Sequence, residues 1–348
     1  MKRSLGLTFW LVVLHSIVAN GQHIHFLLVS DTADPKIGQA CVATVNNVRG
    51  SLQSLIPAQR YSLSVMESQN QRYDAESVVK AIRAVQVEQK DTFVFFYDGH
   101  GARSQGHHFL QMPGGGKLWS ADLQNAVKKK QCHLKVILSG SCNVPAQRGP
   151  AAALAQQWNV QNGIAPVMEE LFVNHDGLMH MNGAWPGQFG FTNNQEGNWL
   201  FAEFLNYCTL CSTGRPTWSA IDRMMDRRLG DRFQKAFGGK YVEAGTGYTQ
   251  TSLKTITWSL PKDASRPSRF GVAGDDGRTR TGVTVIQVDQ RSPARGILQR
   301  GDIITSINGE EVRDADSFFD LVRCSPRQMH LEFTRSGNVT STDVTLPW

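Results

Sequence analysis

The chain has 348 residues, of which 41% are hydrophobic and 19% charged, with a formal net charge of +6. This composition is too apolar for a disordered chain, and its length suggests two domains that each bury a core. Its basic residues are scattered rather than gathered in a stripe, which argues against a nucleic-acid partner. No apolar run reaches the length of a membrane span, so we expect no stable membrane insertion.

The first 21 residues have the organisation of a secretory signal peptide. Two basic residues precede an apolar stretch from Leu5 to Ala19, and Ala19-Asn20-Gly21 supplies small residues for a cleavage site. A membrane anchor or a buried first strand are the alternatives. The apolar stretch is short for a span, and a strand pattern starts directly afterwards at His23. We therefore expect a protein that is secreted or periplasmic.

Apolar strand-like runs alternate with helical stretches between residues 22 and 260. This alternation predicts an α/β domain with a mainly parallel sheet and helices on both faces. We expect strands at 23–30, 61–66, 92–97 and 134–139, and helices at 37–55, after a cap at Asp74, and at 121–130 after a cap at Ser120. A further helix is expected to bury the aromatic side chains of Trp199, Phe201, Phe204 and Tyr207.

The composition changes after a polar, proline-punctuated linker at residues 261–268. Residues 269–348 predict a separate small, strand-rich domain with strands at 283–288, 303–307 and 331–334 and one helix at 316–323. Asn308-Gly309 between two apolar runs is a hairpin signal. Another run, Gly114–Lys117, lacks the other residues of a phosphate loop, so we interpret it as a hairpin tip.

Three predicted strands each end shortly before a side chain that can take part in chemistry. Asp31 follows the first strand, and His100 and Cys142 follow two later strands by three residues each. Because ligands of open α/β sheets bind beyond the carboxyl ends of the strands, these side chains can share one crevice. A thiol beside an imidazole forms a nucleophile–base pair. We expect the N–H groups of Gly101 and Cys142 to form the oxyanion hole.

For Cys142 and His100, the non-catalytic alternative is a structural cysteine in a tight turn and a histidine held by hydrogen bonds.

No metal site is predicted. His107 and His108 have no carboxylate at ligand spacing, so we interpret both as exposed strand residues. Cys208 and Cys211 admit an oxidised pair, a redox motif or two semi-buried thiols at a helix end, and we favour the last. Nothing in the sequence indicates a cofactor or a calcium requirement.

Two segments resemble the signature of the caspases and metacaspases. Residues Phe93–Gly101 form an apolar strand that ends in His-Gly, and residues Val136–Cys142 form a second that ends in a small residue and a cysteine. The segment Gly190–Leu205 is similar to the later strand and helix of that fold. The resemblance covers most of residues 23–260 and implies a caspase-like fold, with His100 as general base or acid, Cys142 as nucleophile and proteins or peptides as substrates.

One position departs from the metacaspase pattern. Metacaspases usually carry an acidic residue two positions before the nucleophile, where it helps to recognise a basic substrate side chain, and Gly140 occupies this position here. Asp31, with Asp34 close by, is our candidate for a substrate-binding carboxylate. The alternative for Asp31 is a helix cap near Ile37. We interpret Asp98 as a turn residue.

A loop after the nucleophile is often cut in caspase-like relatives. In this chain Arg148-Gly149 is the bond that we expect to be cut if the enzyme processes itself.

The C-terminal domain resembles a PDZ domain of the type appended to bacterial serine proteases. The segment Arg269-Phe270-Gly271-Val272 opens it, and Gly301-Asp302 and Asn308-Gly309 follow in the expected order. The resemblance implies that the N–H groups of residues 270–272 cradle the terminal carboxylate of a C-terminal peptide. Phe270, Val272 and Phe318 are expected to line the peptide groove. The alternative is a groove filled by the catalytic domain itself.

The sequence therefore predicts an exported cysteine endopeptidase that acts through a Cys–His dyad and a thioester, with a PDZ domain for peptide docking or regulation. One alternative is a catalytically inactive caspase-like scaffold that binds peptides through its PDZ domain. Another is a hydrolase or transpeptidase of the same fold that acts on something other than protein.

Overall fold

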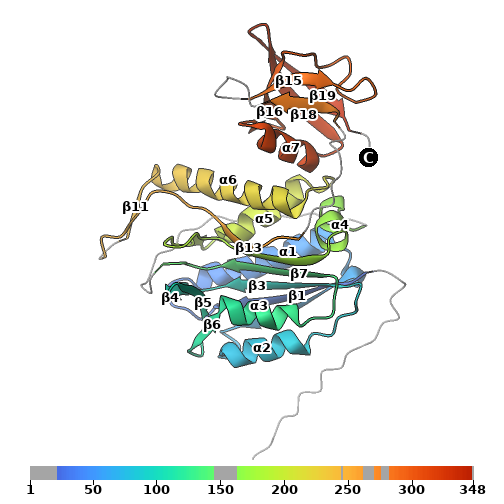
Figure 1. Cartoon of the computed structure of the whole chain (residues 1–348). Helices are drawn as coiled ribbons and strands as arrows, with labels where there is room; N and C mark the ends of the chain where they lie inside the picture. The colour runs from blue at the N-terminus through green and yellow to red at the C-terminus, as the bar shows by residue number, and fades with distance from the viewer. Residues whose placement is uncertain (1–21, 145–162, 244–245, 262–269, 276–281, 347–348) are drawn as a thin grey trace, which may run out of the picture.

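The computed structural model describes residues 22–144, 163–243, 246–261, 270–275 and 282–346 (Figure 1). The predicted signal peptide, the linker after residue 261 and the Arg148-Gly149 bond lie outside these residues. In the described part of the chain, no helix is long and apolar enough to cross a membrane.

A six-stranded sheet forms the centre of the N-terminal domain. Its strand order is β13-β8-β7-β3-β1-β2, and every neighbouring pair is parallel except β13 with β8. The strands are β1 (Ile24–Ser30), β2 (Tyr61–Glu67), β3 (Thr92–Asp98), β7 (Leu134–Gly140), β8 (Gly177–Asn182) and β13 (Ile256–Ser259). All seven residues of β3 are buried, as expected of a central parallel strand.

Helices cover both faces of this sheet. On one side lie α1 (Gly38–Leu55), α5 (Trp199–Leu210) and α6 (Trp218–Phe237), and on the other lie α2 (Ala75–Ala84) and α3 (Ser120–Lys128) (Figure 1). The remaining helical segments are η1 (Ala58–Arg60) and α4 (Pro166–Val173). The prediction of a mainly parallel α/β sheet with helices on both faces is confirmed.

Local signals at the helix ends were informative in one case and misleading in another. The carboxylate of Asp74 accepts the N–H of Ser77 at the start of α2, which confirms that cap. Ser120, by contrast, is the first residue of α3 rather than its cap, and its hydroxyl lies 2.6 Å from a ring nitrogen of His108. The predicted cap at Ser120 is therefore wrong, because a tertiary partner takes the hydroxyl. The four aromatic residues predicted for α5 are buried as expected.

A small antiparallel sheet follows directly after His100. It consists of β4 (Gly101–Ser104), β5 (His107–Gln111) and β6 (Lys117–Trp119), and the glycines at 114–116 form the tip of its second hairpin, as predicted. Two further short ribbons are β9 (Thr192–Asn193) with β10 (Gly197–Asn198), and β11 (Tyr241–Val242) with β12 (Thr249–Gln250).

The C-terminal domain is an antiparallel sheet covered by one helix. Its strands β14 (Val272–Asp275), β15 (Val283–Val288), β16 (Ile303–Ile307), β18 (Gln328–Arg335) and β19 (Asn338–Thr345) are arranged in this order, with β17 (Glu310–Glu311) beside β16 and α7 (Ala315–Cys324) as the helix. Asn308 and Gly309 have φ values of 52° and 79°, which is the backbone of the predicted two-residue hairpin.

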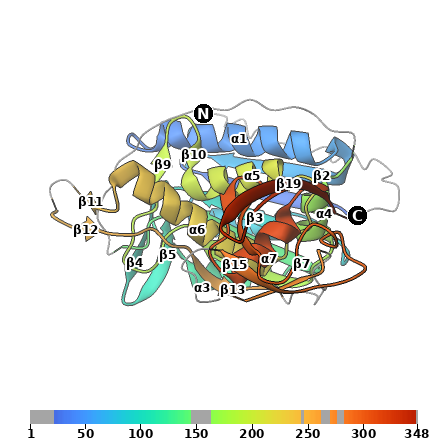
Figure 2. The ribbon, with the colours of Figure 1, turned by 90° about the horizontal axis from the view of Figure 1, so that it is seen from above.

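The two domains contact each other through α6 and α7 (Figures 1 and 2). Arg223 of α6 donates two hydrogen bonds of 2.8 Å to the carboxylate of Asp320 in α7, whose side chain is fully buried. Arg228 of α6 donates to Glu310 at 2.8 Å. The apolar core of the N-terminal domain continues into that of the C-terminal domain. The C-terminal domain is therefore docked on the N-terminal domain through α7 and the neighbouring β17.

Candidate active site

The carboxyl ends of β1, β3 and β7 lie at one edge of the central sheet. Their register places Ser30 opposite Asp98, and Asp98 opposite Gly140. His100 and Cys142 follow two of these ends and both line one small cavity of about 30 Å³. The structure thus brings the predicted histidine and cysteine together. Asp98, Gly140, Gly190 and Asn198 are among the other residues that line this cavity, whereas Asp31 and Gly101 do not line it.

Hydrogen bonds to its neighbours hold His100 in place. Its carbonyl oxygen accepts the N–H of Gln111 and the hydroxyl of the buried Tyr97, each at 2.8 Å. Its ring nitrogen Nε2 lies 3.1 Å from the carboxylate of Asp34. Burial acts to raise the pKa of Asp34, but the N–H groups of Lys36 and Ile37 and the charge of His100 outweigh it and lower this pKa. Asp34 is therefore an ionised partner of the imidazole.

Asp34 and Asp31 make different contacts at this edge of the sheet. The carboxylate of Asp34 also accepts the N–H of Ile37 at 3.0 Å, just before α1, which is the capping contact considered for Asp31. Asp31 is only 7% exposed and accepts the hydroxyl of Ser68 at 2.8 Å. Burial raises the pKa of Asp31. A substrate-binding role for Asp31 stays a prediction, while the carboxylate that touches His100 is that of Asp34.

The thiol of Cys142 is enclosed by backbone. Its Sγ donates to the carbonyl oxygen of Gly190 at 3.6 Å. Burial raises the pKa of this thiol to about 11, and the negative charge of Glu243 acts in the same direction. The preceding residue, Ser141, donates its hydroxyl to Asn182 at 2.9 Å, and the amide of Asn182 donates back to the Ser141 carbonyl at 3.0 Å. Hydrogen bonds therefore hold the loop that carries Cys142, and its thiol is neutral near pH 7.

His108 is not the exposed strand residue that we predicted. It is only 5% exposed, and its Nε2 donates to the carbonyl oxygen of Cys142 at 3.1 Å. Burial lowers its pKa to about 4, so the imidazole is neutral. Because Nε2 carries the proton, Nδ1 accepts the hydroxyl of Ser120. His108 thus holds the backbone of Cys142 through a hydrogen bond, while His107 is exposed as expected.

Two glycines allow the loops of the site to approach closely. A Cβ at Gly101 would lie 2.7 Å from the Cβ of Ser141 and 2.8 Å from the carbonyl oxygen of Cys142. A Cβ at Gly140 would lie 2.3 Å from the Cγ of Asn198. Glycine at these positions is therefore a packing requirement. The assignment of the Gly101 and Cys142 N–H groups to an oxyanion hole stays a prediction.

Asp98 is a buried strand residue rather than a turn residue. It ends β3 and is 1% exposed, and one of its carboxylate oxygens has no hydrogen-bond partner among the residues described. Burial raises the pKa of Asp98 to about 7. The Asp-Gly pair suggested a turn, but the strand continues through Asp98 in register with β1 and β7. The interpretation as turn chemistry is therefore wrong.

The residues predicted to line the peptide groove lie at the start of β14 and in α7. Phe270 and Phe318 are fully buried, with ring centroids 6.2 Å apart, so their rings form the floor between strand and helix. Gly271 has a φ of 69°, which few other residues adopt, and a Cβ there would lie 2.1 Å from the Cβ of Ser292. Val272 begins β14, which pairs only with β15 in the described part of the sheet. A strand edge is thus left open beside α7.

Sequence reasoning missed several residues that build the site. His108 and Asn182 contact the Cys142 loop from other strands, and Glu243 acts on its thiol through charge, so no local pattern could have identified them. Asn198 directly precedes α5 and accepts the N–H of Leu200, so its position as a helix cap was a usable signal.

Within the described ranges, no three His, Cys, Asp or Glu side chains are grouped as metal ligands. Cys208 and Cys211 have free thiols at the end of α5.

Comparison with known proteins gives a similar solved structure and a domain family that matches the C-terminal part of the chain. One similar solved structure is caspase-1 from Spodoptera frugiperda, with 11% identity and a TM-score of 0.46 over 69% of this chain and 87% of that one. No curated protein sequence matches. Residues 284–335 match the PDZ domain family. The C-terminal domain therefore contains a PDZ domain, and the assignment of an activity to the N-terminal domain rests on its site residues.

Proposed function

We propose that the protein is an exported, caspase-like cysteine endopeptidase whose PDZ domain docks peptides. The observation that carries this proposal is that His100 and Cys142, from the ends of two neighbouring parallel strands, line one cavity. A thiol and an imidazole in such a position are the groups needed for acyl transfer. The proposed export rests on the leader-like first 21 residues.

The reaction begins from a neutral thiol, because the pKa of Cys142 is about 11. His100 takes the thiol proton as Sγ forms a bond to the scissile carbonyl carbon, and the carbonyl oxygen becomes the oxyanion. The tetrahedral species collapses when the C–N bond breaks, and His100 gives its proton to the leaving amine. A thioester on Cys142 remains. Water, deprotonated by His100, then attacks this thioester and releases the acid product and the thiol.

Asp34 is the residue that we assign to the orientation of His100. Its carboxylate lies 3.1 Å from Nε2, so the proton on Nε2 is bound and Nδ1 is the nitrogen left for the thiol proton. A carboxylate in this position also stabilises the imidazolium that forms during attack. The N–H groups of Gly101 and Cys142 are the donors that we assign to the oxyanion.

A preference for basic substrate side chains would depend on Asp31 in this proposal. Its burial and its raised pKa weaken its attraction for a cation, because the ionised form is disfavoured. If Asp31→Ala leaves the ratio of cleavage after arginine to cleavage after neutral residues unchanged, this part of the proposal is removed.

For the PDZ domain we propose binding of a C-terminal peptide as an added strand on β14. The open edge of β14 and the positive φ of Gly271 at its start support this mode. A peptide held there remains tethered to the catalytic domain, because α7 is docked on α6. Tethering raises the local substrate concentration without new catalytic contacts.

A second candidate function is an inactive scaffold that acts through the PDZ domain. The closed state of the site favours it, since the cavity measures only about 30 Å³ and the thiol donates to the Gly190 carbonyl. A closed resting site is also what an enzyme shows when substrate binding opens it, so the two candidates differ in turnover and not in resting geometry.

Cleavage of a mixed peptide library by the chain from residue 22 onward tests the proposal, with mass spectrometry of the products. Cys142→Ala and His100→Ala serve as matched controls, because each removes one catalytic group from the same fold. Cleavage by the parent and by neither variant is the expected result. If the parent gives no product with or without calcium, while C-terminal peptides still bind, the scaffold function is supported instead.

A further inference from the structure

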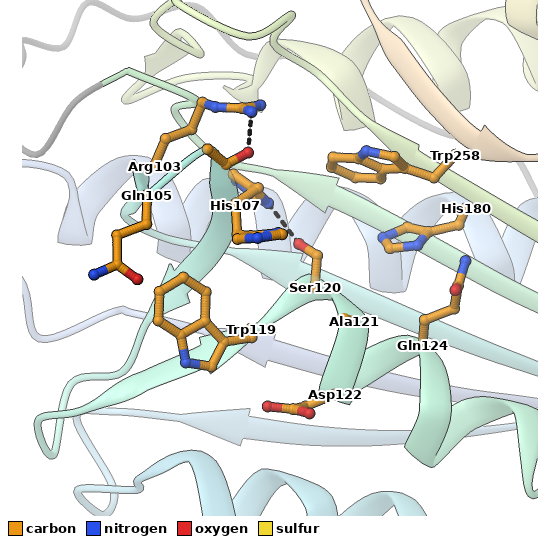
Figure 3. Close-up of a pocket in the computed structure, with 12 residues that line it drawn as sticks. Arg103, Gln105, His107, Trp119, Ser120, Ala121, Asp122, Gln124, His180 and Trp258 are labelled. Carbon is orange, nitrogen blue, oxygen red and sulfur yellow. Dashed lines mark hydrogen bonds between the residues drawn. The ribbon is translucent and has the colours of Figure 1, made fainter.

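A second pocket lies on the α3 side of the sheet, apart from the cavity between His100 and Cys142. It has a volume of about 660 Å³ and is bounded by the β4–β5 hairpin, the start of α3, β8 and β13 (Figure 3). It is lined by Arg103, Gln105, Gly106, His107, His108, Trp119, Ser120, Ala121, Asp122, Gln124, His180 and Trp258. We call it the His180 pocket. None of its residues is used in the peptidase mechanism above.

His180 is the residue in this pocket that most needs a partner. It is 1% exposed, and neither of its ring nitrogens has a hydrogen-bond partner among the residues described. The ring of Trp258 lies against it, with centroids 4.5 Å apart (Figure 3). Burial lowers the pKa of His180 to about 3, so its imidazole is neutral and offers one donor and one acceptor. A buried polar group without partners is destabilising unless a bound molecule satisfies it.

The rest of the pocket suits a flat and uncharged molecule. Trp258 and Trp119 present aromatic surface on two of its sides (Figure 3). Of the two charged residues in the lining, Arg103 donates to the carbonyl of Gly106, and Asp122 lies in the first turn of α3. Their opposite charges leave no net charge to attract an ion. Gln124 adds an amide that can donate and accept.

The pocket is connected to the nucleophile by two hydrogen bonds. Ser120, which lines the pocket, donates to Nδ1 of His108 at 2.6 Å, and His108 donates to the carbonyl oxygen of Cys142 at 3.1 Å. A ligand that binds the Ser120 hydroxyl competes with the first of these bonds. Loss of that bond frees His108 to rotate and releases the backbone of Cys142.

We propose that the His180 pocket binds a neutral, planar molecule that carries a hydrogen-bond donor and an acceptor on one edge, as an amide does, and that binding changes the reactivity of the Cys142 thiol through His108. His180 is the binding residue, and Ser120 and His108 are positioning residues for the nucleophile loop. This inference does not require the protein to cleave peptides.

Three molecules of similar size separate this chemistry from its alternatives. Benzamide carries the planar amide, benzoate replaces it with a charge, and ethylbenzene removes the polar edge. Saturation-transfer NMR on the chain from residue 22 should show that benzamide binds and is not displaced by equal concentrations of the other two. Equal binding of ethylbenzene, or no saturable binding of benzamide, would overturn the proposal.

Variants assign the binding to His180. His180→Phe should weaken benzamide binding about tenfold or more, because the hydrogen bonds are lost while the ring volume is kept. His180→Gln, which still donates and accepts, should retain most of it and guards against a variant that misfolds. Gln131→Ala, at an exposed position outside the pocket, is the matched control and should bind as the parent does. If both His180 variants bind benzamide as tightly as the parent, the pocket does not use His180.

The coupling between ligand binding in the His180 pocket and the Cys142 thiol is measured by the rate at which methyl methanethiosulfonate modifies Cys142. Peptide mass spectrometry follows this modification. Saturating benzamide should change this rate at least about twofold in the parent but not in His108→Phe, in which the connection is absent. An unchanged rate in the parent would refute the coupling. If the parent instead forms dimers that His180→Phe abolishes, the pocket belongs to a second copy of the chain.

Discussion

The side chain of Asn198 occupies the space that a side chain at position 140 would need. Its Nδ2 donates to the carbonyl oxygen of Gly140 at 3.0 Å, and its Oδ1 accepts the N–H of Leu200 at the start of α5. A Cβ on residue 140 would lie 2.3 Å from Cγ of Asn198. Any side chain at position 140, including the acidic one that the metacaspase resemblance led us to look for, is therefore excluded by an amide that also caps a helix.

This relationship predicts strong coupling between the two positions. Gly140→Ala should destabilise the protein by about 2 kcal/mol or more, because the new methyl group overlaps Asn198 in a packed site. Asn198→Ala alone should cost about 1 kcal/mol through loss of the helix cap. The double variant should be more stable than the sum of the two costs predicts, by about 1–3 kcal/mol.

Urea unfolding of the four proteins in this cycle measures the coupling. Gly230→Ala in α6 is the matched control, because its Cβ meets nothing closer than 3.6 Å and should stabilise the helix by about 0.5–1 kcal/mol. Additive costs at 140 and 198 would contradict the packing explanation.

A second prediction concerns the pair formed by His100 and Asp34. Asp34→Asn removes the charge but keeps the size of the side chain, so His100 loses the partner that orients it and stabilises its charged form. We expect kcat to fall about tenfold or more with little change in KM, because the interaction strengthens as the imidazolium forms. Steady-state kinetics on a peptide substrate identified in the library measure this.

Asp91→Asn is the matched control for this variant. Asp91 also lies 3.1 Å from a histidine, His25, and accepts backbone N–H groups as Asp34 does, but it lies at the opposite end of the sheet. It should lower stability without a selective effect on kcat. A rise in KM alone for Asp34→Asn would show that the carboxylate binds substrate instead of orienting His100.

The strands and helices that hold the site were predictable from the sequence because their signals are local. A few consecutive residues are enough to indicate the buried strand at Phe93–Tyr97 and the helix cap at Asp74. Asp98 and His108 show where this approach fails. Much of their surroundings comes from elements more than 30 residues away in the sequence, so an Asp-Gly pair suggested a turn and a His-His pair suggested an exposed strand. Neither pattern reveals burial, which decides the protonation state of both side chains.

A third prediction follows from the raised pKa of Asp98. Its pKa is about 7 in the folded protein against 3.8 for an ordinary aspartate, so the folded state binds the proton more tightly than the unfolded state does. The contribution of Asp98 to stability is complete below pH 4 and is lost as the pH rises to 7. Relative to the parent, Asp98→Asn should gain stability over this range, by at most about 4 kcal/mol.

Urea unfolding at pH 5 and pH 8 tests the sign of this change. The stability difference between Asp98→Asn and the parent should favour the variant more at pH 8. Asp122→Asn, at an exposed position in α3, is the control and should show a difference that does not depend on pH. A variant at position 98 whose relative stability is equal at the two pH values would show that Asp98 is ionised at both.

The final prediction concerns the contact between the PDZ domain and α6. Asp320 is fully buried and paired with Arg223 by two hydrogen bonds of 2.8 Å, so Arg223→Ala removes both of these charged hydrogen bonds from a buried carboxylate. We expect a loss of about 3 kcal/mol in the free energy of unfolding and separate unfolding transitions of the two domains in calorimetry, because the docked state loses a buried polar contact.

Arg313→Ala, which breaks the exposed pair with Asp231, is the matched control and should cost less than about 1 kcal/mol. Equal costs for the two variants, with a single transition in both, would mean that apolar packing alone joins the domains. If the domains do separate while peptide cleavage by the Arg223 variant equals that of the parent, docking on α6 is not needed for catalysis, and the PDZ domain contributes only by binding substrate.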